Sequence, residues 1–262
     1  MSELVSIEKL FSLKGRTCIV TGGSRGIGRT CADYIAAAGA NVAVIGTNRD
    51  TTLAASQKIA EQYGVKTTGI SCHVENRQAV FDMVEQVEQE LGVPDLLFNN
   101  AGICFGGDSE MQSEEDWRAN IDINLNGAFY VMQAVGKKLL EKNMPGSMVC
   151  TASMNAYISC TPQHEAAYNA SKAGLVMLCK SLAVEWGRRR IRVNSISPGY
   201  IMTEMTKTIG DPEMIRSWIN ASPIGRLGEE SDIGGAVVYL LSDAALFTTG
   251  ADLLIDGAFT LI

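Results

Sequence analysis

A chain of 262 residues with a net charge of -7 is too acidic for a general nucleic-acid binder, which carries a basic stripe. Hydrophobic residues make up 46% and charged residues 19%, enough apolar material for a large core and too little charge for disorder. There is no linker, signal-peptide core or apolar run of membrane-spanning length, so we expect one cytoplasmic domain over residues 1–262 and no membrane partner.

Short β-branched runs alternate with longer segments of helical period. Seven runs predict strands, at residues 17–21, 41–45, 67–71, 95–100, 147–153, 192–197 and 252–256. The segments between them are long enough for the crossover helices that parallel strands need. The pattern predicts an α/β fold, a doubly wound (Rossmann) parallel sheet of about seven strands with helices on both faces. Ligands of such folds bind beyond the carboxyl ends of the strands.

The first predicted strand runs directly into the glycine-rich stretch TGGSRGIGRT. Gly22, Gly26 and Gly28 permit a tight turn, and the N-terminus of the following helix favours an anion such as a pyrophosphate. A plain strand-to-helix turn is the alternative. The position directly after the first strand favours dinucleotide binding.

The cysteine and histidine content argues against a metal site. Seven cysteines form no C-x-x-C pair, and the only histidines are His73 and His164. We therefore expect no catalytic metal, and core cysteines in a reducing compartment. The one basic run, at residues 188–190, follows Gly187, where we expect a helix to end and cations to be favourable.

Tyr168 and Lys172 stand four residues apart in EAAYNASKAGLVML, on one face of a predicted helix. A free tyrosine has a pKa near ~10, so about a thousandth of it is ionised at pH 7. A neighbouring ammonium favours the phenolate and suits the pair to proton transfer. A surface pair on an amphipathic helix is the alternative.

The spacing G-x-x-x-G-x-G, together with NNAG at residues 99–102, YNASK at 168–172 and SPGY at 197–200, resembles the short-chain dehydrogenase/reductase family over essentially the whole chain. The resemblance implies nicotinamide-dependent interconversion of a carbonyl and an alcohol, usually by a homotetramer. The run TASMNA and the stretch from LAVEWG to IRVNSISPGY look most like polyol dehydrogenases and ketose reductases.

The resemblance implies four catalytic residues. Tyr168 would be the acid/base, and Lys172 would tune it and hold the nicotinamide ribose. Ser153, expected at the end of the fifth strand, would orient the carbonyl, and Asn124 would anchor a water for proton relay. Ser153 lies fifteen residues before Tyr168, more than the commonest family spacing, so Ser159 is a weaker alternative.

The cofactor site implied by the resemblance draws on the ends of several strands. The expected contacts are Gly22, Ser24, Arg25, Ile27, Gly28, Asn48, Arg49, His73, Val74, Asn100, Ala101, Gly102, Tyr168, Lys172, Pro198, Gly199, Ile201 and Thr203. His73 replaces the family's aspartate near the adenine, and either contacts the base or is an ordinary strand-end residue. Val74 is expected to pack against the adenine. Thr203 alternatively caps the helix that follows.

The end of the second strand predicts the choice of cofactor. An NAD-specific site has a carboxylate there, which would repel a 2′-phosphate. This chain has Gly46 at that position and no acid before Asp50, which we expect to open the next helix. Arg25 and Arg49 can offer guanidinium donors to a phosphate. We therefore expect NADP(H) to be preferred, with NAD(H) possible.

The expected substrate is a small ketose or its polyol. Ser153, Asn155, His164 and Tyr168 are the predicted substrate contacts, because a hydroxyl-rich substrate needs such donors and acceptors. An apolar pocket for a bulkier ketone is the counter-interpretation, and it rests on Met154, Tyr157, Ile158, Met202, Met205 and Trp218.

Residues 200–230 break the alternation and predict a lid over the site. Two other functions stay open. One is a 3-oxoacyl-carrier-protein reductase, which a basic docking patch around residues 188–190 would mark. The other is a non-catalytic, NADP-sensing regulator, which would need no serine, tyrosine and lysine set.

Overall fold

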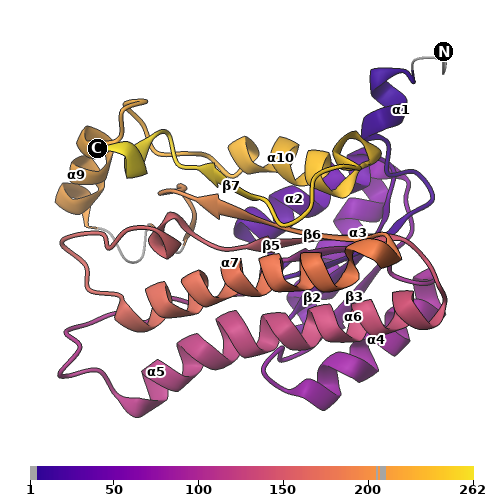
Figure 1. Cartoon of the computed structure of the whole chain (residues 1–262), viewed down its shortest axis with the longest axis horizontal. Helices are drawn as coiled ribbons and strands as arrows, with labels where there is room; N and C mark the ends of the chain where they lie inside the picture. Colours follow the sequence, from indigo (N-terminus) through magenta and orange to yellow (C-terminus); the bar gives the residue numbers. More distant parts are fainter. Residues whose placement is uncertain (1–4, 205, 207–210) are drawn as a thin grey trace.

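The computed structural model describes residues 5–204, 206 and 211–262. In these residues seven strands form one parallel sheet in the order β3-β2-β1-β4-β5-β6-β7, which confirms the predicted fold class. Figure 1 shows the sheet with helices packed around it. The strands are β1 Thr17–Thr21, β2 Asn41–Gly46, β3 Thr67–Ser71, β4 Leu96–Asn99, β5 Gly146–Thr151, β6 Ile191–Pro198 and β7 Asp252–Ile255.

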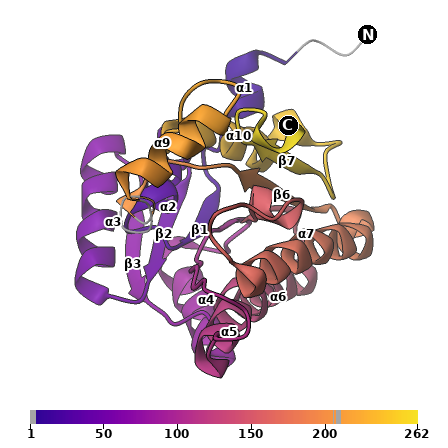
Figure 2. The ribbon, with the colours of Figure 1, turned by 90° about the vertical axis from the view of Figure 1, so that its left-hand side faces the viewer.

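Helices cover both faces of the sheet (Figure 2). Their bounds are α1 Ile7–Phe11, α2 Gly26–Ala37, α3 Arg49–Tyr63, α4 Arg77–Leu91, α5 Glu114–Ile121, α6 Ala128–Glu141, α7 Ala166–Trp186, α9 Pro212–Ala221 and α10 Ser231–Leu241. A π-helical turn, Asp122–Gly127, joins α5 to α6. No helix in the described part of the chain is long and apolar enough to cross a membrane.

Successive side chains of a strand point to opposite faces, which explains the two helical layers. Ile19 of β1 packs in one buried cluster with residues of α4, α6 and α7. Its neighbours Cys18 and Val20 pack in a second cluster with residues of α2, α3 and α10. Every residue of β1 is buried, as a strand covered on both faces requires.

The strand order reverses between β1 and β4, because β1 connects to β2 on one side and β3 connects to β4 on the other. Such a switch point opens a crevice beyond the carboxyl ends of the strands. Most of the predicted site residues follow these strand ends.

The predicted lid segment contains α9, packed beside the chain's C-terminal turn (Figure 1). An isolated parallel bridge joins Ile201 to Gly228, so both ends of the segment lie near the end of β6. Met205 and residues 207–210 lie outside the described residues.

Candidate active site

Hydrogen bonds join the ends of β1, β4 and β5. The Thr21 hydroxyl accepts the backbone N–H groups of Asn100 at 2.9 Å and Ala101 at 3.0 Å. The Thr151 hydroxyl donates to the Asn100 side-chain oxygen at 3.2 Å. These hydrogen bonds of Asn100 and Ala101 therefore connect the ends of the three strands.

The glycine turn after β1 needs its glycines. Gly22 and Gly26 have positive φ angles of 64° and 60°. A Cβ on Gly28 would lie 2.2 Å from the Gly22 carbonyl oxygen and 2.6 Å from Nδ2 of Asn100. Helix α2 starts at Gly26 without a side-chain cap, so its first N–H groups are available to an anion. The turn fits a pyrophosphate.

Tyr168 and Lys172 lie one turn apart on α7, as predicted. The Lys172 ammonium is 5.6 Å from the centre of the Tyr168 ring and donates a 2.7 Å hydrogen bond to the Thr151 carbonyl oxygen. Only 3% of Lys172 is exposed, and burial lowers its pKa to about 8. A Cβ on Gly102 would lie 3.4 Å from the ammonium, so the loop after β4 passes close to Lys172.

The pKa of Tyr168 differs from the expected direction. Burial raises it well above 10, and the negative charge of Glu165 adds to the rise, whereas a hydrogen bond with Ser153 opposes it. Burial, with the neighbouring Cys104 and Glu165, therefore outweighs the lowering expected from Lys172. Tyr168 is therefore a protonated phenol at neutral pH.

Ser153 is the serine that faces the phenol. It lies beyond β5, which ends at Thr151, so the prediction that Ser153 ends the strand is wrong. Its hydroxyl instead caps the turn Met154–Ala156 and accepts the Asn155 N–H at 3.1 Å. Ser159, the weaker alternative, is exposed. The geometry favours Ser153.

Asn124 lies in the π-helical turn and is 1% exposed. Its side chain accepts the Ile103 N–H at 2.9 Å and donates to the Ile103 carbonyl at 2.9 Å and to the Ser171 hydroxyl at 3.1 Å. Such π turns recur at functional sites. The side chain connects the loop after β4 to α7, one residue before Lys172.

Residues 22–260 match a family model described as enoyl-(acyl carrier protein) reductase. A short-chain type dehydrogenase/reductase from Mycobacterium marinum superposes with a TM-score of 0.94 at 36% identity, covering 98% of this chain and 100% of that one. The chain belongs to the short-chain dehydrogenase/reductase family.

Two relatives in this family have named activities. A sorbose reductase of Candida albicans is 40% identical over 253 residues, which cover 96% of this chain and 89% of that protein. An NADP-dependent mannitol dehydrogenase of Hypocrea jecorina is 39% identical over 254 residues, which cover 96% of this chain and 94% of that protein.

The predicted phosphate contacts of this dehydrogenase/reductase lie at the starts of two helices, Arg25 directly before α2 and Arg49 in α3. Arg49 is the first residue of that helix, and Asn48 caps it by accepting the Thr51 N–H at 3.0 Å. Arg25 and Arg49 are exposed, and neither forms an ion pair with another described residue. Ser24 lies beside Gly46, whose Cβ would be 3.5 Å from the serine oxygen. The predicted contact Ile27 lies in the first turn of α2.

The two residues expected at the adenine differ in environment. His73 is exposed, and its Nδ1 lies 3.0 Å from Oε1 of Glu75. Val74 is 6% exposed and packs against Gly127. Val74 is thus largely covered by the protein itself, whereas His73 is open to a ligand.

The predicted cofactor contacts in the loop after β6 are also in contact with other parts of the protein. Pro198 ends the strand, and a Cβ on Gly199 would lie 2.7 Å from Cα of Asp256, so this glycine lets two backbones approach. Ile201 is 5% exposed. The Thr203 hydroxyl accepts the Thr206 N–H at 3.2 Å, the capping role weighed as its alternative.

Three of the predicted substrate contacts, Ser153, Asn155 and Tyr168, lie together, but the side chains of Asn155 and His164 are engaged by other residues. Asn155 is 7% exposed, and its amide donates to Glu165 and Asn169, at 2.8 Å each. His164 is exposed and paired with Asp108 at 2.6 Å. Sequence reasoning missed Glu165, although its position three residues before Tyr168 places it within one helical turn.

Several side chains of the alternative apolar pocket are also buried or engaged by other residues. Met154 is 2% exposed, and Trp218 is 3% exposed and stacks on Tyr200 with ring centres 4.2 Å apart. Tyr157 is directed to Asp252, to which its hydroxyl donates at 2.9 Å. Met205 lies outside the described residues.

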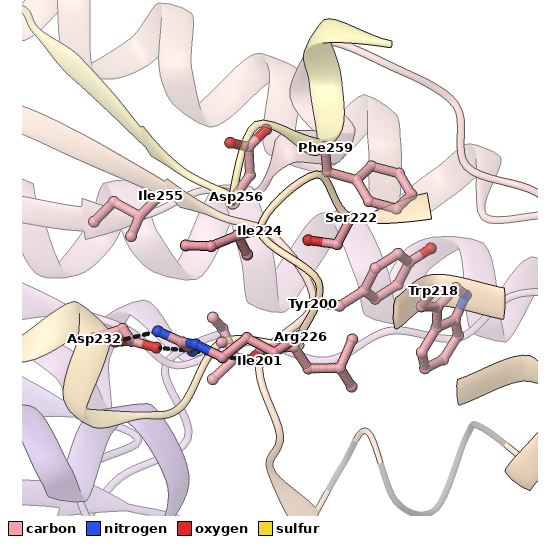
Figure 3. Close-up of a pocket in the computed structure, with 13 residues that line it drawn as sticks. Tyr200, Ile201, Trp218, Ser222, Ile224, Arg226, Asp232, Ile255, Asp256 and Phe259 are labelled. Atoms are coloured by element: carbon pink, nitrogen blue, oxygen red, sulfur yellow. Dashed lines mark hydrogen bonds and ion pairs between the residues drawn. The ribbon is translucent and has the colours of Figure 1, made fainter. Parts of the chain in front are cut away.

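A cavity of about 230 Å³ lies beside this site, between α9 and the C-terminal turn (Figure 3). Tyr200, Trp218, Phe259 and the Arg226–Asp232 ion pair line it, and the catalytic set does not. No group of three or more potential metal ligands occurs among the residues that the structure describes.

Proposed function

We propose that the chain is an NADP(H)-dependent oxidoreductase that interconverts a small ketose and its polyol. The observation that carries the proposal is the juxtaposition of Ser153, Tyr168 and Lys172 beside a glycine turn that only glycines can form. The names of the sorbose reductase and the mannitol dehydrogenase support the substrate class.

Tyr168 donates the proton in the reductive direction. The phenol carries a proton that it can deliver to the carbonyl oxygen, and because burial raises its pKa the phenolate that forms needs stabilisation by a neighbouring charge. Ser153, hydrogen-bonded to the phenol, donates to the same oxygen as negative charge develops there. The nicotinamide, when bound, supplies or accepts the hydride.

Lys172 stabilises the phenolate that remains after proton transfer. Its ammonium is buried, so its charge acts on the phenol with little screening by water. Its pKa of about 8 leaves it mostly charged at pH 7. The family resemblance also gives Lys172 the nicotinamide ribose hydroxyls as partners.

Asn124 positions this set and anchors the proton relay. Through Ile103 and Ser171 it fixes the loop after β4 against α7. We assign the remaining cofactor contacts as the sequence predicts, with Asn48 contributing through its backbone because its side-chain oxygen caps α3.

The preference for NADP(H) rests on charge. Arg25 and Arg49 are exposed beside the end of β2, and the carboxylate that would repel a 2′-phosphate is missing from residues 46–49. The mannitol dehydrogenase relative is named as NADP-dependent.

The alternative of an acyl-carrier-protein reductase has one observation in its favour, the description of the matching family model. Its docking patch is less well supported. The Arg189 guanidinium donates to the Leu140 carbonyl at 3.3 Å, and that of Arg190 to the Asn143 carbonyl at 3.2 Å, at the end of α6. These cations therefore interact with the end of α6, and not with the end of α7, the helix that precedes Gly187 and at which the sequence predicts them to act. The regulator alternative leaves the catalytic set without a role.

We further propose a single domain with a lid at residues 200–230, assembled as a homotetramer in the cytoplasm. Exposed apolar side chains support the assembly, with Val184 on α7 85% exposed, Phe247 fully exposed and Leu254 on the edge strand β7 43% exposed.

Activity assays that combine each substrate class with each cofactor test the proposal. Ketoses with NADPH or NADH, and polyols with NADP⁺ or NAD⁺, are followed by the absorbance of the reduced nicotinamide. We expect turnover of a ketose such as sorbose or fructose and a clear preference for NADPH. Turnover confined to acetoacetyl thioesters would support the alternative enzyme.

A further inference from the structure

Glu165 is a carboxylate that the proposed mechanism does not use. It lies directly before α7, three residues from Tyr168, and is half-buried. It occupies the cap position of this helix, yet its side chain makes no capping hydrogen bond to the helix N–H groups. The carboxylate is directed elsewhere.

The carboxylate is held by two donors. Nδ2 of Asn155 donates to Oε2 at 2.8 Å, and the Cys104 thiol donates to Oε1 at 3.4 Å. Asn155 is itself fixed, because Nδ2 also donates to Asn169 at 2.8 Å and Oδ1 accepts from the Cys160 thiol at 3.4 Å. A surface carboxylate with free rotation would not be held in this way.

Acceptor capacity remains on this carboxylate. An ionised carboxylate offers about four lone-pair sites. Among the described residues one strong donor and one weak thiol donor use it, so Oε1 in particular can accept from hydroxyl groups. Among the residues that the structure describes, no arginine or lysine forms an ion pair with Glu165.

The position of Glu165 points to the substrate. Asn155, its partner, donates its backbone N–H to the Ser153 hydroxyl that faces Tyr168. The Glu165 charge also acts on the phenol of Tyr168 and on Tyr200. A carbonyl oxygen bound by Ser153 and Tyr168 therefore brings the neighbouring carbons of its substrate close to the carboxylate.

We infer that Glu165 accepts hydrogen bonds from hydroxyl groups next to the reacting carbon, and that its charge selects neutral ketoses and polyols over sugar acids of the same length. This inference rests on the proposed function and adds a specificity residue to it. A carboxylate strengthens a hydroxyl hydrogen bond and repels another carboxylate, so both effects act in the same direction.

The test compares the wild-type enzyme with Glu165→Gln on three substrates: fructose, cyclohexanone, which lacks hydroxyl groups, and 5-ketogluconate. We expect kcat/KM for fructose to fall about 10- to 100-fold, as for loss of a hydrogen bond to a charged group. We expect cyclohexanone to change less than about threefold, 5-ketogluconate to improve relative to fructose, and NADPH affinity to be unchanged. Glu114→Gln, at a 70% exposed carboxylate on α5, is the matched control and should leave all three values unchanged.

A parallel loss on fructose and cyclohexanone would show a structural role and overturn the inference. If Glu165→Gln folds poorly, inhibition of the wild-type enzyme decides: a neutral polyol should bind at least about tenfold more tightly than the matching aldonate, and equal binding overturns the inference. A wild-type enzyme without activity on any ketose would overturn the proposed function and the inference together. Fructose turnover with an unchanged substrate ratio in the variant would overturn the inference alone.

Discussion

The Lys172 ammonium lies 5.6 Å from the centre of the Tyr168 ring, and its hydrogen bond to the Thr151 carbonyl oxygen holds it between α7 and the end of β5. Burial disfavours the charged form of each, so it raises the pKa of the phenol and lowers that of the ammonium. The pair thus begins with a neutral phenol beside a cation that can stabilise its anion.

Replacing Tyr168 by phenylalanine removes only the proton-transfer oxygen. We expect turnover to fall at least about 1,000-fold, because the variant loses both general acid catalysis and the phenol's hydrogen bond to the carbonyl oxygen. NADPH affinity should stay nearly unchanged. Steady-state kinetics and a fluorescence titration with NADPH measure the two quantities. Substantial turnover in this variant would rule out Tyr168 as the acid.

Replacing Lys172 by methionine separates stability from activity. In the folded protein its pKa falls from the usual 10.5 to about 8, so between these values the unfolded chain holds a proton that the folded one has released. Stability from this group therefore rises with pH across that window, and the buried ammonium costs roughly 3 kcal/mol below pH 8. The lost hydrogen bond to Thr151 offsets about 1 kcal/mol of the gain.

We therefore expect Lys172→Met to be inactive, to bind cofactor weakly and yet to be more stable than the wild type at pH 7. Its advantage should shrink towards pH 10. Urea unfolding of both proteins at pH 7 and pH 10 measures this. A stability difference that does not change with pH would contradict the lowered pKa of Lys172.

Two glycine-to-alanine variants test the turn after β1. At Gly28 the new methyl group would lie 2.2 Å from the Gly22 oxygen, so we expect Gly28→Ala to lose NADPH binding and stability. Gly235 on α10 has no atom within 4 Å of its ideal Cβ, so Gly235→Ala should keep full activity and gain up to about 1 kcal/mol of stability. Calorimetry and cofactor titration compare the pair. Equal behaviour of the two variants would refute the account of the turn.

The double variant Arg25→Ala/Arg49→Ala tests cofactor choice. We expect kcat/KM with NADPH to fall by about 10- to 100-fold, because each guanidinium supplies charged donors to the phosphate, and the value with NADH to change little. Arg188→Ala, in the exposed basic run, is the control. A preserved NADPH preference in the double variant would show that other groups bind the phosphate.

The sequence predicts the sheet well because parallel strands buried on both faces need β-branched, apolar runs. All seven predicted strands are present, and the bounds of β1 and β3 match the prediction. The end of β5 does not: the strand ends at Thr151, two positions before Ser153, whose side chain caps the turn that follows.

The site is predicted less completely. The spacing of Tyr168 and Lys172 follows from helical geometry, but the pKa of Tyr168 depends on burial and on Cys104, which only tertiary packing brings to the site. The roles of Asn155 and Asn124 likewise depend on partners that no periodicity indicates, namely Glu165 and Ile103.

The most direct test of the central claim is one ratio: kcat/KM with NADPH for a ketose, set against the values for an acetoacetyl thioester and for an apolar ketone under the same conditions. We predict the ketose value to be the highest. An advantage of about a hundredfold for either competitor, roughly 2.7 kcal/mol in transition-state binding, would contradict a ketose/polyol oxidoreductase.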